Sequence, residues 1–600
     1  MDKISSRALK ITSRSFLEMR IPLSLFVKRL ESRAAFRFLR NETINKKNRT
    51  SGGFFVKKMG CSASKNGTSS TSEEYVEGVV CNEDEINENE MKVLDLEDVG
   101  KILLVKQKGK LTAIGAKCTH AGALLSTGAL GDGRVRCPWH GACFNITTGD
   151  IEDFPGLDSL PCYQVKVENN QVKVRARKND VATNKRLNTM SKLDLNNNEC
   201  FVVIGAGPAG GTCVETLRQE GFTGRIVLIS KENSLPYDRV KISKAMDMPL
   251  DKIQFRNDSF YRDHDIEVMK GIAAIGVDTN EKLVKLDNGN DVGYSKLFIA
   301  TGCKAVKTPI PGVELKNIEV LRNFNHAAYV HSQLTPDKEI VVLGSSYIAL
   351  EAASYSVNKV KKVTVVMRSD VPFKPLLGPR IGAAFKAFFE EKGVVFIPNS
   401  GIKRCIDDGH GFINSVELIN DEIIKADLCI MGVGSRLYTD FLKSSQVDIR
   451  EDGSIEVDDF METNVKGVYA GGDLAYAPVW SYRNIKSVIG HYPLAHMHGK
   501  IAALNMLEKK KPLKAVPFFW TMLFGKGIRY AGHGKYTDIV YSGDVEGLKF
   551  VAFYLDEDEV VAVSSCQMDP IVSEFAEILA QGKKLYRKDL TGDDHLGWRH

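Results

Sequence analysis

Two cysteine–histidine pairs are the residues in this chain most able to bind metal. One residue separates Cys118 from His120, two separate Cys137 from His140, and sixteen lie between the pairs. Two thiolates and two imidazoles suit a [2Fe–2S] cluster in which the cysteines hold one iron and the histidines the other. A structural zinc ion also accepts two cysteines and two histidines. The short Cys-x-His spacing and the turn at Cys137-Pro-Trp-His140-Gly141 favour the iron–sulphur cluster.

The segment around these ligands resembles a Rieske domain, a small β-domain, from about Tyr75 to Arg177. Cys137–Phe144 has the CPWHGA-x-F form of the ferredoxin-like members. High-potential Rieske proteins link the two cluster loops by a disulphide and place Ser and Tyr beside the cluster. The matching positions here are Ala123, Trp139, Ala142 and Phe144. Fewer hydrogen bonds to sulphur stabilise the reduced form less, so we expect a low-potential cluster.

A glycine-rich loop downstream predicts a bound dinucleotide. Cys200–Ile204 is an unbroken apolar run, as in a parallel strand buried on both faces. Gly205, Gly207 and Gly210 follow with G-x-G-x-x-G spacing. They allow a tight turn, close approach of a pyrophosphate, and packing of helix against strand. Glu232 lies near the place where an acid meets the ribose hydroxyls.

A second unit of this kind begins after the apolar strand Glu339–Leu343. Its loop starts at Gly344, but Ser346 replaces the middle glycine and Ala349 the last. Alanine is an accepted variant at the third place, whereas a side chain at the second hinders the pyrophosphate. We predict NAD(P)H binding here, with loss of nucleotide affinity as the alternative.

The residues after the next strand, Lys362–Val366, bear on the coenzyme. An NAD site places an acid near Met367, whereas Arg368 and Ser369 suit a 2′-phosphate. The sequence therefore leans to NADPH or to no strong preference.

Two strand ends between and after these loops suit a flavin as the first nucleotide. Thr301 and Gly302 end one strand, and Asp473 follows a glycine pair at the end of another. A carboxylate beside a glycine pair can accept hydrogen bonds from a ribityl chain, although an ordinary turn aspartate is the simpler alternative.

Taken in order, these motifs resemble the pyridine-nucleotide–disulphide oxidoreductase superfamily, in its ferredoxin-reductase and apoptosis-inducing-factor branch. Leu235–Arg239 and then Ser243-Lys244 are similar to the flavin-contacting LPYDR…LSK segment, which places Arg239 at the flavin. No C-x-x-C accompanies the flavin domain. The resemblance extends from about Glu74 to Lys584 and includes members that carry an N-terminal Rieske domain.

The resemblance implies roles for several side chains. Lys244 would tune the flavin, with a structural ion pair as the alternative, and Glu351 would position the nicotinamide, with a helix-surface site as the alternative. His491 and Tyr492 would line the flavin site, although a core histidine is the competing interpretation. Trp520 and the two phenylalanines before it would approach the flavin or simply belong to the core.

The predicted fold is an N-terminal all-β Rieske domain, then an α/β reductase fold with two dinucleotide-binding domains, then a small C-terminal α/β domain. The expected divisions are a basic extension at 1–73, the Rieske domain at 74–178, FAD-binding parts at 199–335 and 461–510, the NAD(P)-binding domain at 336–460, and a dimerisation-like domain at 512–586.

Composition is that of a globular chain of 600 residues with a formal charge of +6, which does not imply a nucleic-acid partner. The twelve cysteines lack disulphide-framework spacing and no apolar run is long enough to span a bilayer. The first 58 residues are basic and resemble a mitochondrial transit peptide. If translation began at Met59, Gly60 and Cys61 would instead form a lipidation signal, and the protein would be cytoplasmic and attached to membranes.

We therefore predict an oxidoreductase that passes electrons from NAD(P)H through FAD to the [2Fe–2S] cluster and on to an unknown acceptor. The resemblance also implies a role in apoptosis and a possible homodimer, and the lipidation signal implies possible peripheral membrane association. The alternative is an apoptotic signalling scaffold with little turnover.

Overall fold

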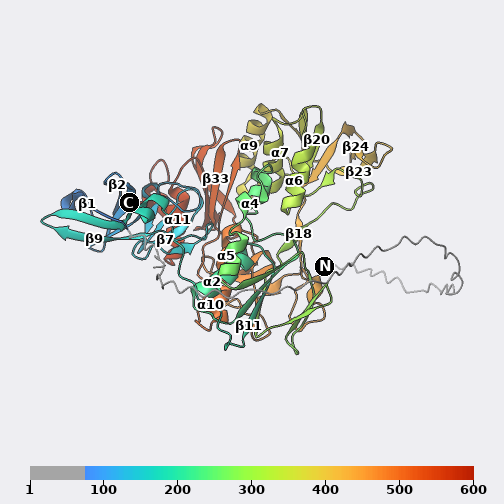
Figure 1. Ribbon diagram of the computed structural model, residues 1–600. Coiled ribbons are helices and arrows are strands. Elements are labelled where there is room, and N and C mark those ends of the chain that lie inside the picture. The colour runs from blue at the N-terminus through green and yellow to red at the C-terminus, as the bar shows by residue number, and fades with distance from the viewer. Residues whose placement is uncertain (1–73, 600) are drawn as a thin grey trace, which may run out of the picture. The chain divides into compact units, whose positions relative to one another are not determined.

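The computed structural model describes residues 74–599 (Figure 1). The predicted basic extension, with both of its targeting signals, lies outside the described residues. None of the helices within residues 74–599 has the length and apolar character needed to cross a bilayer.

The N-terminal domain is built on two β-sheets, as predicted. Its larger sheet is antiparallel and contains β1 (Tyr75–Asn82), β10 (Gln171–Arg177), β9 (Cys162–Glu168), β4 (Lys110–Gly115), β3 (Gly100–Gln107) and β2 (Glu90–Leu96), in that order. The smaller sheet contains β5 (Ala129–Gly131), β6 (Arg134–Arg136), β7 (Cys143–Asn145) and β8 (Ile151–Asp153). The first Cys/His pair lies between β4 and β5 and the second between β6 and β7, so this smaller sheet positions the metal ligands.

A five-stranded parallel sheet forms the centre of the first α/β lobe. Its order is β13 (Ile266–Lys270), β12 (Arg225–Ser230), β11 (Cys200–Ile204), β17 (Lys296–Ile299) and β29 (Val468–Ala470). The central strand β11 is buried on both faces. The helices α2 (Pro208–Gln219) and α10 (Tyr492–Met506) pack together and contact β11 and β29, and a strand of a small sheet, at Asp291–Gly293, also contacts β11 (Figure 1). Smaller elements of this lobe are α3 (Lys241–Lys244), α4 (Leu250–Ile253), α5 (Asp258–Asp263), β14 (Ala274–Asp278), β15 (Leu283–Leu286), β16 (Asp291–Gly293), β30 (Ala475–Val479) and β31 (Ile485–Val488). The short helix α1 (Lys178–Thr183) packs instead against β10 and β3 of the N-terminal domain.

The second α/β lobe repeats this plan. Its sheet runs β19 (Ile318–Glu319), β26 (Leu428–Met431), β20 (Glu339–Leu343), β21 (Lys362–Val366) and β22 (Val394–Ile397). Its other elements are α6 (Phe324–Gln333), α7 (Tyr347–Ser356), α8 (Lys374–Leu377), α9 (Pro379–Glu391), β23 (Ile402–Asp407), β24 (Ile413–Leu418) and β25 (Ile423–Lys425). Each lobe thus holds one glycine-type loop at the carboxyl end of its central strand.

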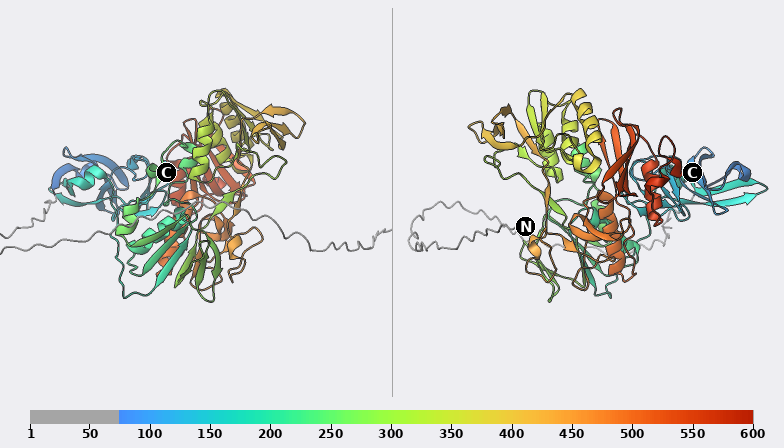
Figure 2. Two further views of the ribbon diagram at one scale, coloured as in Figure 1. Left: turned by 45° about the vertical axis from the view of Figure 1, so that its right-hand side comes forward. Right: turned by 180° about the vertical axis from the view of Figure 1, so that it is seen from behind.

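The C-terminal domain is an antiparallel sheet covered by one helix, α11 (Ile571–Ala580). The strand order is β32 (Phe518–Leu523), β33 (Lys526–Gly532), β36 (Glu559–Cys566), β35 (Lys549–Asp556) and β34 (Asp538–Asp544). The helix also packs against β5 and β6, so the N-terminal and C-terminal domains of residues 74–599 lie side by side (Figure 2).

Three short strand pairs correct the domain boundaries predicted at 335/336 and 460/461. β19 belongs to the second lobe, β27 (Ser435–Leu437) pairs with β18 (Cys303–Ala305), and β28 (Ile455–Glu456) pairs with β30. Strands of two or three residues are too short to show a hydrophobic alternation in the sequence. The sequence-based prediction therefore placed each of them in the same domain as the residues beside it in the chain. The chain enters the second lobe before residue 336 and leaves it before residue 461.

Candidate functional site

The two predicted metal-binding loops have the same backbone geometry. The Cys118 amide donates to the Ala123 carbonyl at 2.8 Å and the Cys137 amide donates to that of Ala142 at 2.7 Å. In each loop the glycine four residues after the cysteine donates back to the cysteine carbonyl. Both cysteine side chains are buried, and the two thiols lie within hydrogen-bonding reach of each other. The structure therefore brings together two loops that are separate in the sequence.

The two histidines meet in the same place. The Nδ1 atoms of His120 and His140 lie 3.0 Å apart, with the ring centroids separated by 4.8 Å. Burial lowers the pKa of His120 to about 4 and that of His140 to about 2. Neutral imidazoles with converging Nδ1 atoms fit two ligands of one iron, and the paired thiols fit two ligands of the other. Within residues 74–599, no three metal-binding side chains converge on one point as for a single ion.

The first glycine loop opens onto a cavity of about 760 Å³. A Cβ atom on Gly210 would lie 1.9 Å from the Gly205 carbonyl oxygen, and one on Gly205 would lie 2.3 Å from that of Ala300. A Cβ on Gly207 would meet nothing nearer than Arg239 Nε at 4.0 Å, so the chain leaves open space there. This is the arrangement that packs helix on strand and admits a pyrophosphate.

Glu232 also lines this cavity, at the end of β12. Its carboxylate accepts hydrogen bonds from Arg239 Nη2 at 2.5 Å and from the Tyr237 hydroxyl at 2.7 Å. The predicted ribose acid and the predicted flavin-contacting arginine therefore form an ion pair on the cavity wall.

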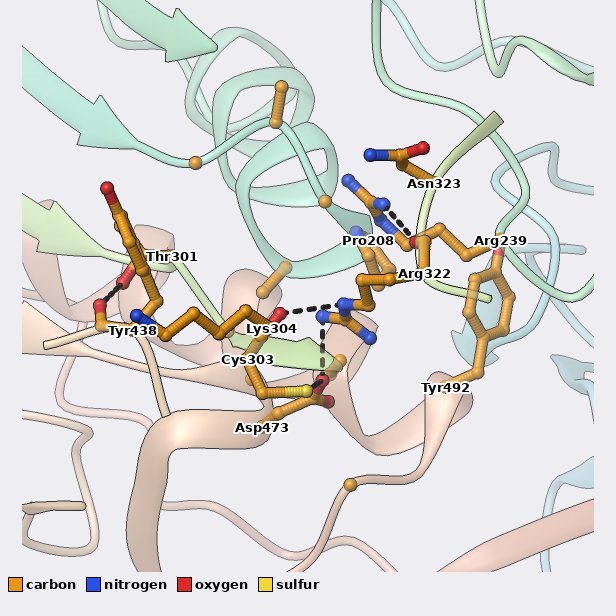
Figure 3. A pocket seen from close by; sticks show the side chains of 18 of the residues that line it. Pro208, Arg239, Thr301, Cys303, Lys304, Arg322, Asn323, Tyr438, Asp473 and Tyr492 are labelled. Atoms are coloured by element: carbon orange, nitrogen blue, oxygen red, sulfur yellow. Dashed lines mark hydrogen bonds and ion pairs between the residues drawn. The ribbon is translucent and has the colours of Figure 1, made fainter. Parts of the chain in front are cut away.

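Asp473 also lines the cavity, beside Thr301 and Gly302. Arg322 Nη2 lies 3.0 Å from its Oδ2 atom and the Cys303 thiol 3.3 Å from the same atom (Figure 3). Burial alone would raise the pKa of Asp473, but Arg322 and the thiol hold it below its usual value. An ionised carboxylate at this place can accept hydrogen bonds from sugar or ribityl hydroxyls.

Three buried polar atoms on the cavity wall have no partner within residues 74–599. They are the Tyr347 hydroxyl, His326 Nδ1 and His491 Nδ1. Buried polar atoms are normally hydrogen-bonded, so these atoms fit a large polar ligand in the cavity. Burial lowers the pKa of His491 to about 4, which keeps its ring neutral. The glycine cradle, the ribose acid and these unpaired atoms together fit a flavin dinucleotide.

Glu351 joins three parts of the chain at this cavity. Its side chain is 3% exposed, so the predicted helix-surface alternative does not describe its position. Lys244 Nζ donates to one carboxylate oxygen at 2.6 Å, Thr521 donates to the same oxygen at 2.6 Å, and Ser243 donates to the other at 2.5 Å. A buried carboxylate is stable here because one cation and two hydroxyls satisfy it.

Trp520 stands between the cavity and the metal ligands. Its indole lies 4.5 Å from the His140 ring and 5.9 Å from the His120 ring, measured between centroids. The same side chain lines the cavity, next to Phe519, whose ring lies 4.9 Å from that of His491. One aromatic side chain thus contacts both predicted sites.

A buried ion network fixes the metal-binding domain to α11. Glu577 accepts from Arg136 Nε at 2.6 Å and from Arg134 Nε at 2.8 Å. Ser573 on the same helix donates to the Cys137 carbonyl at 3.0 Å. The contact therefore holds a ligand loop directly and not only the surface of the domain.

The second glycine-type loop lies at the carboxyl end of β20. Gly344 has a left-handed φ of 115°, and a Cβ there would lie 2.4 Å from the Gly432 carbonyl oxygen. Ser346 caps the start of α7 with an extended backbone. The second loop thus requires glycine at position 344, where the chain turns, whereas its middle position, 346, accepts a side chain.

Several residues that form contacts at or beside the two sites carried no detectable sequence signal. Arg322 follows a two-residue strand, and Thr521 stands in an ordinary alternating strand. Glu577 lies on the amphipathic helix α11, where a glutamate suggests only a solvated position. Each acquires its contact from a segment more than a hundred residues away.

Comparison with known proteins agrees with this geometry. Residues 200–499 match the family model for pyridine nucleotide-disulphide oxidoreductase, and residues 77–164 match the Rieske [2Fe-2S] domain. The chain is 40% identical over 524 residues to apoptosis-inducing factor 3 from Homo sapiens, covering 86% of both chains. It is 27% identical to rubredoxin-NAD(+) reductase from Ectopseudomonas oleovorans, covering 61% of this chain and 96% of the relative.

Solved structures show the same fold at low identity. The covalent putidaredoxin reductase–putidaredoxin complex superposes with a TM-score of 0.62 at 23% identity, covering 64% of this chain and 94% of that one. A ferredoxin reductase from Rhodopseudomonas palustris gives 0.63 at 22% identity, covering 67% and 99%.

Proposed function

We propose a route for electrons in this chain on the premise that it belongs to the pyridine nucleotide-disulphide oxidoreductase family and carries a Rieske [2Fe-2S] domain. It is an NAD(P)H-dependent FAD oxidoreductase, and its cofactors are FAD and a [2Fe–2S] cluster. In the proposed route, electrons enter from NAD(P)H at FAD, and their first acceptor is the cluster of the same polypeptide.

The cavity residues of this chain would support the first half of that route. FAD accepts two electrons together as hydride and releases them singly, which a one-electron cluster requires. Lys244 and Glu351 form an ion pair on the cavity wall where flavin and nicotinamide would meet. Because Ser243 and Thr521 also bind Glu351, the lysine ammonium is held in one position, and a fixed positive charge favours a reduced flavin.

The observation that carries the proposal is the position of Trp520. Its indole lies against both cluster histidines and also lines the flavin cavity. Electron transfer slows steeply with distance, so a route through contacting rings is faster than one through solvent or an outside carrier. The buried ion network at Glu577 keeps the two sites at this separation.

The test is rapid mixing of holoprotein with NADPH or NADH without oxygen, following flavin and cluster absorbance separately. We expect Trp520→Leu to slow reduction of the cluster at least about tenfold more than it changes reduction of the flavin. Trp480→Phe is the matched control, because Trp480 is also half-buried but lies against Lys514, away from the cavity. Equal cluster reduction in wild type and Trp520→Leu, or a cluster that NAD(P)H never reduces, contradicts the proposal.

A role in apoptosis is supported by the name of the relatives that are about 40% identical. The competing proposal is a scaffold with little turnover. Steady-state oxidation of NADH and NADPH with ferricyanide separates them, since holoprotein without turnover favours the scaffold.

We further propose a mitochondrial location from the basic extension, with lipidation at Gly60 as the alternative if translation starts at Met59. Sequencing the mature N-terminus by mass spectrometry distinguishes them, because a myristoylated Gly60 excludes the transit peptide. A homodimer through the C-terminal domain is a separate proposal, and a monomer by sedimentation at micromolar concentration contradicts it.

A further inference from the structure

The carboxyl end of β21 lies beside the second nucleotide loop. The Gly344 amide donates to the Val366 carbonyl at 2.9 Å, and Ser345 Oγ lies 3.4 Å from Ser369 Oγ. In this fold, the side chains after the second strand meet the 2′ position of the adenosine ribose. Residues 367–369 therefore decide whether a 2′-hydroxyl or a 2′-phosphate fits.

The residues from 367 to 374 offer no unpaired carboxylate. Met367 occupies the place of the usual acid, and its side chain is packed into the core with 1% exposure. Asp370 is the nearest acid, and Lys374 Nζ binds its two oxygens at 2.9 and 3.0 Å. The place of the usual ribose acid therefore holds no carboxylate, and the nearest carboxylate already carries a cation, so NADH would lack its usual anchor here.

The charge that is present suits a phosphate instead. Arg368 is exposed, and within residues 74–599 its guanidinium forms no ion pair. A guanidinium binds a phosphate with two parallel charge-assisted hydrogen bonds. Recruiting Arg368 breaks no existing interaction, and Lys374 adds positive charge close by.

We propose that Arg368 selects NADPH over NADH by binding the 2′-phosphate. This inference rests on the proposed function for the reaction itself, but it concerns only which coenzyme enters. Loss of a charge-assisted bidentate contact predicts an effect of about tenfold or more on the use of NADPH and none on the use of NADH.

The first experiment compares kcat/KM for the two coenzymes with ferricyanide as acceptor. We expect holoprotein to favour NADPH by at least about tenfold and Arg368→Gln to remove that preference by lowering only the NADPH value. Arg404→Gln is the matched control on the same lobe. Arg404 is 54% exposed and pairs with Glu417. When Arg404 is replaced, Glu417 still pairs with Lys403 at 2.8 Å.

The second experiment measures binding without turnover. Calorimetry of holoprotein should show 2′,5′-ADP binding more tightly than 5′-AMP, with the difference lost in Arg368→Gln and kept in Arg404→Gln. Equal or better use of NADH by wild type, or an Arg368→Gln variant that still discriminates, overturns the inference. If neither coenzyme is oxidised but 2′,5′-ADP still binds through Arg368, the proposed reaction fails while the coenzyme assignment stands.

Discussion

Replacing Glu577 by alanine removes the carboxylate that ties α11 to the Rieske domain. Among residues 74–599, Arg136 then keeps Asp153 Oδ2 at 2.5 Å and the Gly141 carbonyl at 2.9 Å, and Arg134 loses its 2.8 Å partner. Arg136 is 1% exposed, so water does not replace the missing charge while the domains stay together.

The size of the effect follows from that burial. Removing one partner of a buried ion pair costs about 3–5 kcal/mol. Because Asp153 still pairs with Arg136, we expect the lower end of this range, about 3 kcal/mol. Both arginines belong to the Rieske domain and regain water when it leaves α11. The loss therefore weakens the docking of the Rieske domain on α11. About 3 kcal/mol corresponds to roughly a 100-fold shift toward the open form, in which the two have separated.

Hydrogen exchange reports this opening directly, since interface amides exchange in proportion to the open population. We expect amides of β5 and β6 to exchange about 100-fold faster in Glu577→Ala, with reduction of the cluster slowed more than reduction of the flavin. Glu574→Ala is the control on the same helix, because its pair with Arg599 lies at the surface and contributes at most about 1 kcal/mol. Unchanged exchange in β5 and β6 would refute the reasoning.

Three further predictions concern the cofactor sites and stability. Lys244→Met should retain flavin but lower its rate of reduction by NAD(P)H at least about tenfold, because Glu351 loses its cation; an unchanged stopped-flow rate contradicts this. Ala142→Ser should raise the midpoint potential of the cluster in an EPR-monitored titration, since a hydroxyl beside the cluster can donate to sulphur; a strongly positive wild-type midpoint would disprove the low-potential expectation. Burial lowers the pKa of His496 to about 3 and of His498 to about 4, from 6.5, so the unfolded state binds more protons between pH 6.5 and about 4. The free energy of unfolding should therefore decrease as the pH is lowered through that window, by up to about 2.7 kcal/mol per pH unit. Urea unfolding at pH 5 and pH 7 checks this.

Sequence predicted those parts of the site whose chemistry depends on spacing along one segment. Cys118 and His120 must share a loop to reach one cluster, and Gly205, Gly207 and Gly210 must share a turn to admit a pyrophosphate. The fold class followed for the same reason, because each unit is a local strand–loop–helix pattern.

The remainder depends on contacts between distant segments. Glu351 was identified only through resemblance, and nothing in its helix indicates that Lys244 and Thr521 will both bind it. Arg322 and Asp473 are separated by 151 residues, and they come after β19 and β29, strands that belong to different sheets. The domain boundaries differ from the predicted ones because short strands near them pair with strands of the other lobe. A strand of two residues is too short to show a hydrophobic alternation in the sequence.

The ligand loop itself shows why the two redox sites are built as one unit. Gly141 has a left-handed φ of 75°, and a Cβ there would lie 2.8 Å from the ring of Phe518 on β32. A side chain at 141 would therefore strain the loop and also push away the strand that carries Trp520, two residues further on. The same glycine thus shapes the turn that presents His140 and permits the close approach of the C-terminal sheet. Because one residue serves both purposes, the geometry of the cluster loop and the contact with the flavin cavity cannot vary independently.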